Sequence, residues 1–355
     1  MKLRKDPTKS YKLDIIVFSR HRNKELSQSI KAWNSLPYNF IILHNSDKPI
    51  VNINTGSHIQ YKFLPQNNYG QRAKVASSLL TQDFAMILSD DERIIPSGLD
   101  YIMEEFIKDK LLATVGGKVL GVYRYGKTLT GLFTYKNMYN YKNYTHEILP
   151  RLYSHLTKPI NKGYAIGGMY RVMRRKDMIS MLNLFNKCSF IQKQTPFIYE
   201  IVGEFACATF GPTKTINKVY WIRNWKTRIT NTADWRRGDN FFIWWTTNNY
   251  PIAKQKLLEI LSSFASITVK ETEKIIDEYN KLRGNQKERR VKSHLEVTVR
   301  EKIRKIIPNS IIGSSTPISL IDTLKNEDLG SQKKDLDKIV QVCEEMLNSP
   351  GRIIL

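Results

Sequence analysis

The stretch FAMILSDDERIIPSGLDYI, residues 84–102, joins an apolar run directly to three consecutive acids, Asp90, Asp91 and Glu92. The apolar run shows no alternation of polar and apolar positions, which is typical of a strand buried on both faces of a parallel sheet. Adjacent carboxylates repel one another, so the cluster raises the cost of folding unless it faces water or binds a cation. Open α/β sheets bind their ligands at the carboxyl ends of such strands. The stretch therefore predicts an α/β fold with a metal site at this edge.

Strands and helices alternate along the first 120 residues, which predicts βα units on a mostly parallel central sheet. The expected strands are 13–19, 40–47, 58–65 and 84–89, and the expected helices are 25–36, 69–82 and 97–110. Residues 120–165 read as irregular and tyrosine-rich. After them we expect a strand at 163–175, helices at 176–187 and 196–211, and a strand at 214–225.

Beyond residue 250 the apolar periodicity is helical, without strands, at 252–282 and 333–348. We therefore expect a domain over 1–250 and a basic helical extension over 251–355. The extension would dock a partner or a membrane, or pack on the first domain.

The chain has 355 residues, a net charge of +23 and three cysteines. Such a charge attracts nucleic acid, anionic membranes or phosphorylated substrates, and composition alone does not choose among them. Few scattered cysteines indicate a reducing compartment. Because the sequence shows neither a signal-peptide pattern nor a run of 18 apolar residues, we expect a cytoplasmic protein.

One stretch, GVYRYGKT at 121–128, matches the G-x-x-x-x-G-K-[ST] pattern of a phosphate-binding P-loop. A P-loop must lead into a helix whose N-terminus holds the phosphates. The following residues, 129–144, have poor helical periodicity and include Gly131. The pattern therefore predicts no ATPase site.

The βα units up to the acids, together with GYAIGGMYRVMRR (163–175) and VGEFACATF (202–210), resemble the GT-A glycosyltransferases of the family 2-like kind. The resemblance covers roughly residues 12–225. It implies a GT-A (nucleotide-diphospho-sugar transferase) fold and a hexosyltransferase-type activity, EC 2.4, in surface polysaccharide synthesis. The implied reaction moves a sugar from a nucleotide-diphosphate donor to a glycan or lipid-linked acceptor, with inversion and with peripheral contact to the cytoplasmic membrane face.

The resemblance also implies a donor site at the strand ends. Its acid cluster corresponds to an Asp-x-Asp motif, with Glu92 in place of the last Asp. Asp90 and Glu92 would hold the metal, and Mg²⁺ or Mn²⁺ suits such hard oxygen ligands. The expected nucleotide-sugar-binding residues are Ser19, Arg20, Asn45, Ser46, Asp47, Gly70, Arg72, Asp90 and Asp91.

The acceptor site is expected at Gly167, Gly168 and Trp225. An inverting transfer needs a general base for the acceptor hydroxyl. By the resemblance this base is Glu204, and Glu200, one helical turn earlier, is the alternative. Ordinary turns, a β-bulge and ion pairs with lysine or arginine are structural alternatives for these positions.

Two other functions compete with the transferase. A basic nucleic-acid-binding protein fits the charge, but no helix-turn-helix, RNA-binding aromatic signature or zinc spacing supports it, and no nucleic-acid partner is expected. A metal-dependent nucleotide or phosphate enzyme would explain the acids. Such sites gather further ligands from other strand ends, which here offer only Asp47 and His21.

Overall fold

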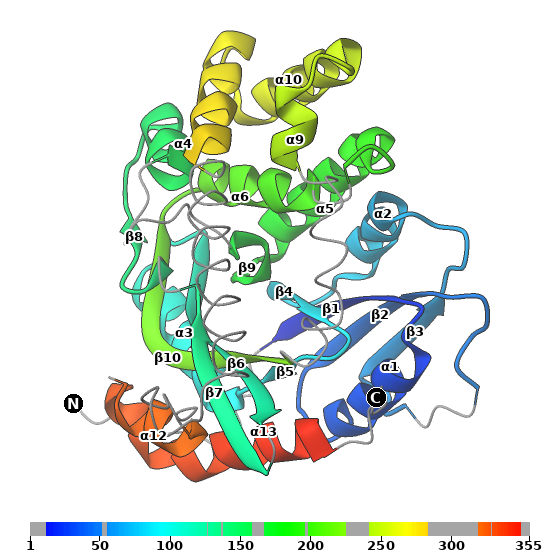
Figure 1. The fold of residues 1–355 in the computed structure, drawn as a ribbon. Helices are drawn as coiled ribbons and strands as arrows, with labels where there is room; N and C mark the ends of the chain where they lie inside the picture. The colour runs from blue at the N-terminus through cyan, green and yellow to red at the C-terminus, as the bar shows by residue number, and fades with distance from the viewer. Residues whose placement is uncertain are drawn as a thin grey trace, which may run out of the picture.

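The computed structural model describes residues 12–51, 55–125, 127–135, 138–157, 167–195, 198–224, 241–282, 319–327 and 329–348. Its centre is one mixed sheet in which neighbouring strands follow the order β3-β2-β1-β4-β9-β6-β10-β5, with β7 beside β6 and β8 beside β10 (Figure 1). The strands are β1 (Leu13–Arg20), β2 (Asn39–Asn45), β3 (Ile59–Phe63), β4 (Phe84–Ser89), β5 (Arg93–Ile94), β6 (Thr114–Tyr125), β7 (Thr128–Thr134), β8 (Lys142–Asn143), β9 (Val172–Arg174) and β10 (Thr213–Asn224).

The first half of the sheet is parallel, as the βα alternation predicted. Strand β1 pairs in parallel with both β2 and β4, and β2 pairs in parallel with β3. Strands β6 and β10 also pair in parallel, while the short β9 joins β4 to β6 in antiparallel fashion. The predicted α/β class with a mostly parallel central sheet is confirmed.

Helices cover both faces of this sheet (Figure 1). They are α1 (Asn23–Trp33), α2 (Tyr69–Leu79), α3 (Pro96–Lys108), α4 (Ile148–Thr157), α5 (Arg175–Lys187), α6 (Ile198–Phe210), α9 (Phe241–Thr246), α10 (Pro251–Ala265), α12 (Leu320–Lys325) and α13 (Leu336–Asn348), with a further helix at 269–282 and short 3₁₀ turns η3 (Gly168–Tyr170), η4 (Cys188–Ile191) and η5 (Gly330–Asp335).

Strand β4 explains why its sequence shows no polar alternation. Ala85 and Ile87 pack into the core formed with α2, α5 and α6, whereas Met86 and Leu88 pack into the core formed with α1 and α3. Since successive side chains of a strand point to opposite faces, a strand covered by helices on both sides must be apolar throughout.

The second half of the chain differs from the sequence prediction in two places. The described part of 120–157 contains regular elements: the end of β6 and β7 form an antiparallel hairpin, and β8 and α4 follow. The P-loop-like stretch 121–128 lies across this hairpin, so no helix follows it. In the predicted strand 163–175, the described part is a loop residue, the turn η3 and a three-residue strand, β9.

The helices beyond residue 250 pack on the sheet domain at two opposite ends of the molecule (Figure 1). Helix α10 contacts α6 and η4, while α12 and α13 cover β6, β7 and β10. Val122, Phe133 and Ile222 of the sheet share one core with Leu324 and Cys343 of these last helices. Much of the basic stretch 281–307 lies outside the described residues, and the domain boundary near 250 remains a prediction. No helix in the described ranges is long and apolar enough to cross a membrane.

Candidate active site at the carboxyl edge of the sheet

The parallel pairing of β1, β2 and β4 brings their carboxyl ends to one edge. Ser19 lies opposite His44 in β2, and Phe18 lies opposite Ser89 in β4. Next to this edge is a cleft with a cavity volume of about 1040 Å³. Its lining residues come from distant parts of the chain, Arg20, Asn45 and Arg72 from the first 80 residues and Lys193, Tyr199 and Glu200 from the segment at 190–200.

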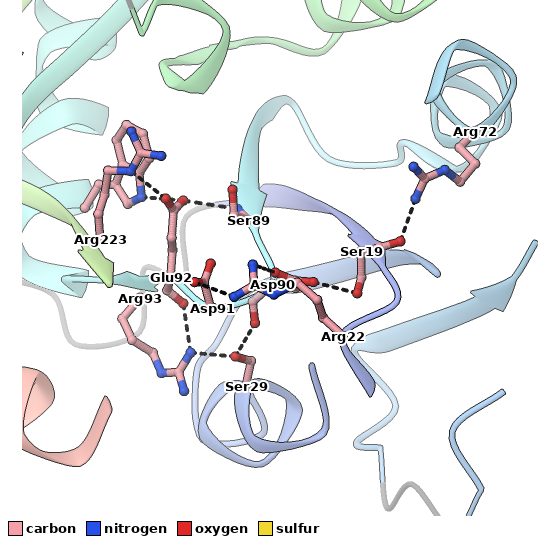
Figure 2. Close-up of polar contacts among 11 residues, drawn as sticks. Ser19, Arg22, Ser29, Arg72, Ser89, Asp90, Asp91, Glu92, Arg93 and Arg223 are labelled. Carbon is pink, nitrogen blue, oxygen red and sulfur yellow. Dashed lines mark hydrogen bonds and ion pairs between the residues drawn. The ribbon is translucent and has the colours of Figure 1, made fainter. Parts of the chain in front are cut away.

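Two acids of the cluster are held by one arginine. Arg22 donates from Nη1 to Oδ1 of Asp90 at 2.8 Å and from Nη2 to Oδ2 of Asp91 at 2.6 Å (Figure 2). Ser19 donates its hydroxyl to the other Asp90 oxygen at 2.6 Å. Ser29 of α1 donates to the Asp90 backbone carbonyl. Asp90 is therefore fixed between the end of β1 and the start of α1.

The third acid, Glu92, reaches toward a different arginine. Its Oε1 accepts from Nε of Arg223 at 2.7 Å, and its Oε2 accepts from Nε1 of Trp221 at 2.7 Å (Figure 2). Arg223 also donates to the hydroxyl of Tyr135. Glu92 is thus joined to β10, whereas Asp90 and Asp91 are joined to Arg22.

Burial dominates the electrostatics of this cluster. It raises the pKa of Asp90 to about 7, although Arg22 acts in the opposite direction. Burial likewise raises the pKa of Glu92, against the effect of Arg223. Burial lowers the pKa of Arg22, but Asp90 and Asp91 outweigh it and hold that pKa above its ordinary value. Arg22 and Arg223 therefore compensate the charges of buried carboxylates, not of carboxylates at the surface.

The expected metal ligands do not fit a divalent cation as they are arranged. Both oxygens of Asp90 and both of Glu92 already accept hydrogen bonds, and the two carboxylates serve different arginines. Within the described ranges, no three His, Cys, Asp or Glu side chains gather as a ligand set. Mn²⁺ or Mg²⁺ thus stays a prediction from the sequence.

Arg72 lines the cleft but binds the backbone rather than an acid. Its Nη1 donates to the carbonyls of Ser19 at 2.7 Å and Leu43 at 3.0 Å, which ties α2 to the ends of β1 and β2. Burial lowers its pKa to about 10. Its Nε is buried and has no hydrogen-bond partner among the described atoms. Arg72 therefore shapes this end of the cleft by tying α2 to the ends of β1 and β2.

The other expected donor-binding residues differ in where they lie relative to the cleft. Arg20 and Asn45 line the cleft, and Asn45 donates to the carbonyl of Asn67 at 2.7 Å. Ser46 is buried and Asp47 is exposed just beyond β2. Gly70 has a packing role instead, because a Cβ there would lie 2.6 Å from Ser189 Cβ and 2.8 Å from the Phe185 carbonyl oxygen.

The two candidate bases on α6 have different surroundings. Glu204 is only 2% exposed and lies under η3, where its Oε1 accepts from the Gly168 N–H at 2.6 Å and its Oε2 lies 2.9 Å from Nε2 of His155. Glu200 lines the cleft. Glu200 thus lies at the cleft, whereas Glu204 is bound to the turn η3 and to His155, and the base role expected for Glu204 stays a prediction.

Of the expected acceptor residues, two are described and one is not. Gly167 has φ +86°, a conformation that favours glycine, and it directly precedes η3, which contains the cleft residues Met169 and Tyr170. A Cβ on Gly168 would lie 2.5 Å from Oε2 of Glu204, so that site permits only glycine without a shift. Trp225 lies outside the described residues.

Sequence reasoning missed the residues that complete the site. Arg22 and Arg223 were not singled out, although they neutralise the acid cluster from 68 and 131 positions away. His155 is likewise new, and it connects Glu204 to the hydroxyl of Tyr141 at 2.9 Å. No local spacing marks these residues, because each pairs with its partner only through the tertiary fold.

Comparison with known proteins gives likenesses of fold. No family model matches the sequence, and no curated protein matches it. The crystal structure of S. aureus TarS has 12% identity and a TM-score of 0.42, and the match covers 76% of this chain and 54% of that one. The chain thus spans about half the length of that structure.

Two structures of TarS 1–349 match at similar levels. The first has 10% identity and a TM-score of 0.43, covering 78% of this chain and 91% of that one. The second, in complex with UDP-GlcNAc, has 11% identity and a TM-score of 0.45, covering 76% and 71%. At these TM-scores the matches carry no argument about the fold, so the GT-A fold stays a prediction from the sequence. The matches do not assign the chain to a family. Any proposal about its function must therefore be argued from the residues of the cleft.

Proposed function

We propose that the protein is a glycosyltransferase that moves a sugar from a nucleotide-diphosphate donor to a glycan or lipid-linked acceptor. One observation carries the proposal: Glu200 of α6 lines the same cleft as Arg20 and Asn45, which lie at the carboxyl ends of β1 and β2. A nucleotide site at the strand ends and a base on the facing helix are the two parts that such a transfer needs.

The cleft is polar and cationic. Arg20, Arg72 and Lys193 line it together with the amides of Asn45 and Gln192. Amides can hydrogen-bond a base or a ribose, and cations favour a diphosphate. The aromatic rings of Tyr69 and Tyr199, whose centroids are 4.5 Å apart, form an apolar wall in the same cleft.

In the proposed reaction, Glu200 takes the proton of the acceptor hydroxyl as that oxygen attacks the anomeric carbon. The bond from this carbon to the donor diphosphate breaks, and the diphosphate leaves with the electron pair. A single displacement of this kind inverts the anomeric configuration. Cations beside the departing oxygen stabilise the charge that develops there.

We also propose that the acceptor is lipid-linked and that the enzyme works at the cytoplasmic face of a membrane, in surface polysaccharide synthesis. Phe190 on the cleft rim is 36% exposed, and the ammonium of Lys256 lies 4.6 Å from its ring centre. Ile252, one turn before Lys256 on α10, is 84% exposed. Exposed apolar and basic side chains together favour an anionic lipid surface.

Vesicle co-sedimentation checks the membrane part of this proposal. Binding should require anionic lipid, weaken with salt and fall in the double variant Ile252→Ser with Lys256→Gln. Binding that is equal on neutral vesicles, or unchanged in this variant, would refute it.

The donor is tested by thermal shift with a panel of UDP-, GDP-, CDP- and ADP-sugars. A ligand that binds the folded state raises the unfolding temperature, and free sugars without the nucleotide should not. Arg20→Gln should weaken the effect, whereas Lys31→Gln, at an exposed position outside the cleft, should leave it unchanged. If no nucleotide sugar stabilises the protein at millimolar concentration, the proposed function is wrong.

No observation favours the competing enzyme. A metal-dependent phosphohydrolase needs a gathered ligand set, and the part of the chain that the structure describes has none.

A further inference from the structure

The acid cluster is surrounded by arginine side chains of the same chain. Three acids, Asp90, Asp91 and Glu92, have Arg22 and Arg223 as ion-pair partners. A third arginine, Arg93, is also buried and donates to the Glu92 backbone carbonyl at 2.9 Å. Three carboxylates and three guanidiniums therefore share one region.

Arg22 differs from the other two arginines in its exposure. Its side chain is 31% exposed, while the side chains of Asp90 and Asp91 are 3% and 10% exposed. Arg22 also precedes α1 as its N-cap residue. Its guanidinium therefore occupies the cation position between the carboxylates of Asp90 and Asp91. Arg22 is not among the residues that line the cleft, but Arg20, two residues before it, is.

A guanidinium can bridge two anionic groups at once. It carries five N–H donors, and the two acids use one Nη1 and one Nη2 hydrogen bond. The remaining edge of such a group matches a phosphate in geometry and charge, which an ammonium does less well.

We propose that Arg22 takes the place of the divalent cation in donor binding: it neutralises Asp90 and Asp91 and presents its exposed edge to the donor diphosphate. The proposal rests on the proposed function. It assigns Arg22 as a substrate-binding residue and makes donor binding independent of metal.

Titration calorimetry tests this with UDP, GDP and CDP as probes, each in EDTA and in Mn²⁺. The wild-type affinity for the diphosphate that binds should agree within about twofold between the two conditions. Arg22→Gln should weaken binding in EDTA by tenfold or more, because two buried carboxylates then face the diphosphate without their cation. Arg22→Lys keeps the positive charge but loses the bridge to both carboxylates. Its affinity in EDTA should therefore lie between those of the wild type and Arg22→Gln.

The matched control is Lys24→Gln, which removes the same charge at an exposed position on α1, two residues away. Its affinity should equal that of the wild type. A tenfold or larger loss of wild-type affinity in EDTA overturns the proposal, as does an Arg22→Gln affinity equal to that of the Lys24→Gln control.

A second measurement does not depend on any nucleotide. Electron paramagnetic resonance of Mn²⁺ with the ligand-free protein should show no bound ion in the wild type. Micromolar Mn²⁺ binding that Asp90→Asn abolishes would show that the acids accept a metal beside Arg22, and the proposal would be wrong. If no nucleoside diphosphate binds, the proposed function fails by itself, and this measurement still decides whether Arg22 excludes the metal.

Discussion

The carboxylate of Glu204 accepts a hydrogen bond from the backbone N–H of Gly168 at 2.6 Å, although 36 residues separate them in the sequence. This bond joins the middle of α6 to the turn η3, which carries the cleft residues Met169 and Tyr170. An acid that was expected to act on a substrate thus supports the backbone that a substrate would meet. Glu200, one helical turn away, lines the cleft and is the residue to which we assign the catalytic role in the proposed reaction.

A pair of isosteric variants separates these roles. Glu200→Gln should lower turnover by about 10²- to 10⁴-fold, the usual effect of removing a general base, while donor affinity stays the same. Glu204→Gln should instead lower the free energy of unfolding by about 1–3 kcal/mol, since a buried hydrogen-bonded carboxylate is replaced. Steady-state kinetics and urea unfolding measure both. If Glu204→Gln is stable but inactive, and Glu200→Gln is fully active, the assignment must be reversed.

The packing role of Gly70 predicts a loss of stability. Gly70→Ala would place a methyl group against Ser189 and the Phe185 carbonyl, and overpacking of this kind costs about 1–3 kcal/mol. Ser189→Gly removes the nearer of the two contacts, so the double variant should recover part of the loss. Denaturant unfolding of the wild type, the two single variants and the double variant measures this double-mutant cycle. A Gly70→Ala variant with wild-type stability and weakened nucleotide binding would instead support the ligand role expected from the sequence.

Asp90 should make stability depend on pH. Burial raises its pKa in the folded protein to about 7, against about 3.9 in an unfolded chain. The folded state therefore holds a proton that the unfolded state loses, so this stabilisation is complete below about pH 4 and is lost as the pH rises toward 7. The free energy of unfolding of the wild type, relative to Asp90→Asn, should fall over this range by at most ~1.4 kcal/mol per pH unit. Parallel curves for the two proteins would contradict the prediction.

Gln332 should be essential for the attachment of the C-terminal helices. Strand β10 shifts register against β6 at Val219, and there the Gln332 amide donates to the Val219 carbonyl at 2.8 Å and accepts from its N–H at 2.7 Å. Gln332→Ala leaves two buried backbone groups without partners, each at a cost of about 1–3 kcal/mol. Gln341→Ala, at an exposed position on α13 whose side chain bonds Glu345, is the control and should change little. Thermal unfolding compares them, and equal melting temperatures would contradict the role of Gln332.

The sequence by itself determined the elements whose signal is local. The βα units up to Lys108 were predicted because apolar periodicity and N-terminal helix signals such as Pro96 depend on neighbouring residues only. The apolar strand at 84–89 and the acids after it were placed correctly at the carboxyl edge for the same reason. The hairpin of β6 and β7 was missed, because its strands contain glycines and polar residues that only pairing and burial make stable.

Only the tertiary structure decided what the acids contact. Arg22, Arg223 and His155 reach their partners across 49 to 131 positions, and no spacing rule connects residues so far apart. It also decided which glutamate of α6 faces the cleft, since Glu200 and Glu204 lie one turn apart and the sequence gives both the same helical context. The physical reason is that charge pairing and access to solvent depend on how elements pack together, whereas periodicity and capping report only on how each element forms.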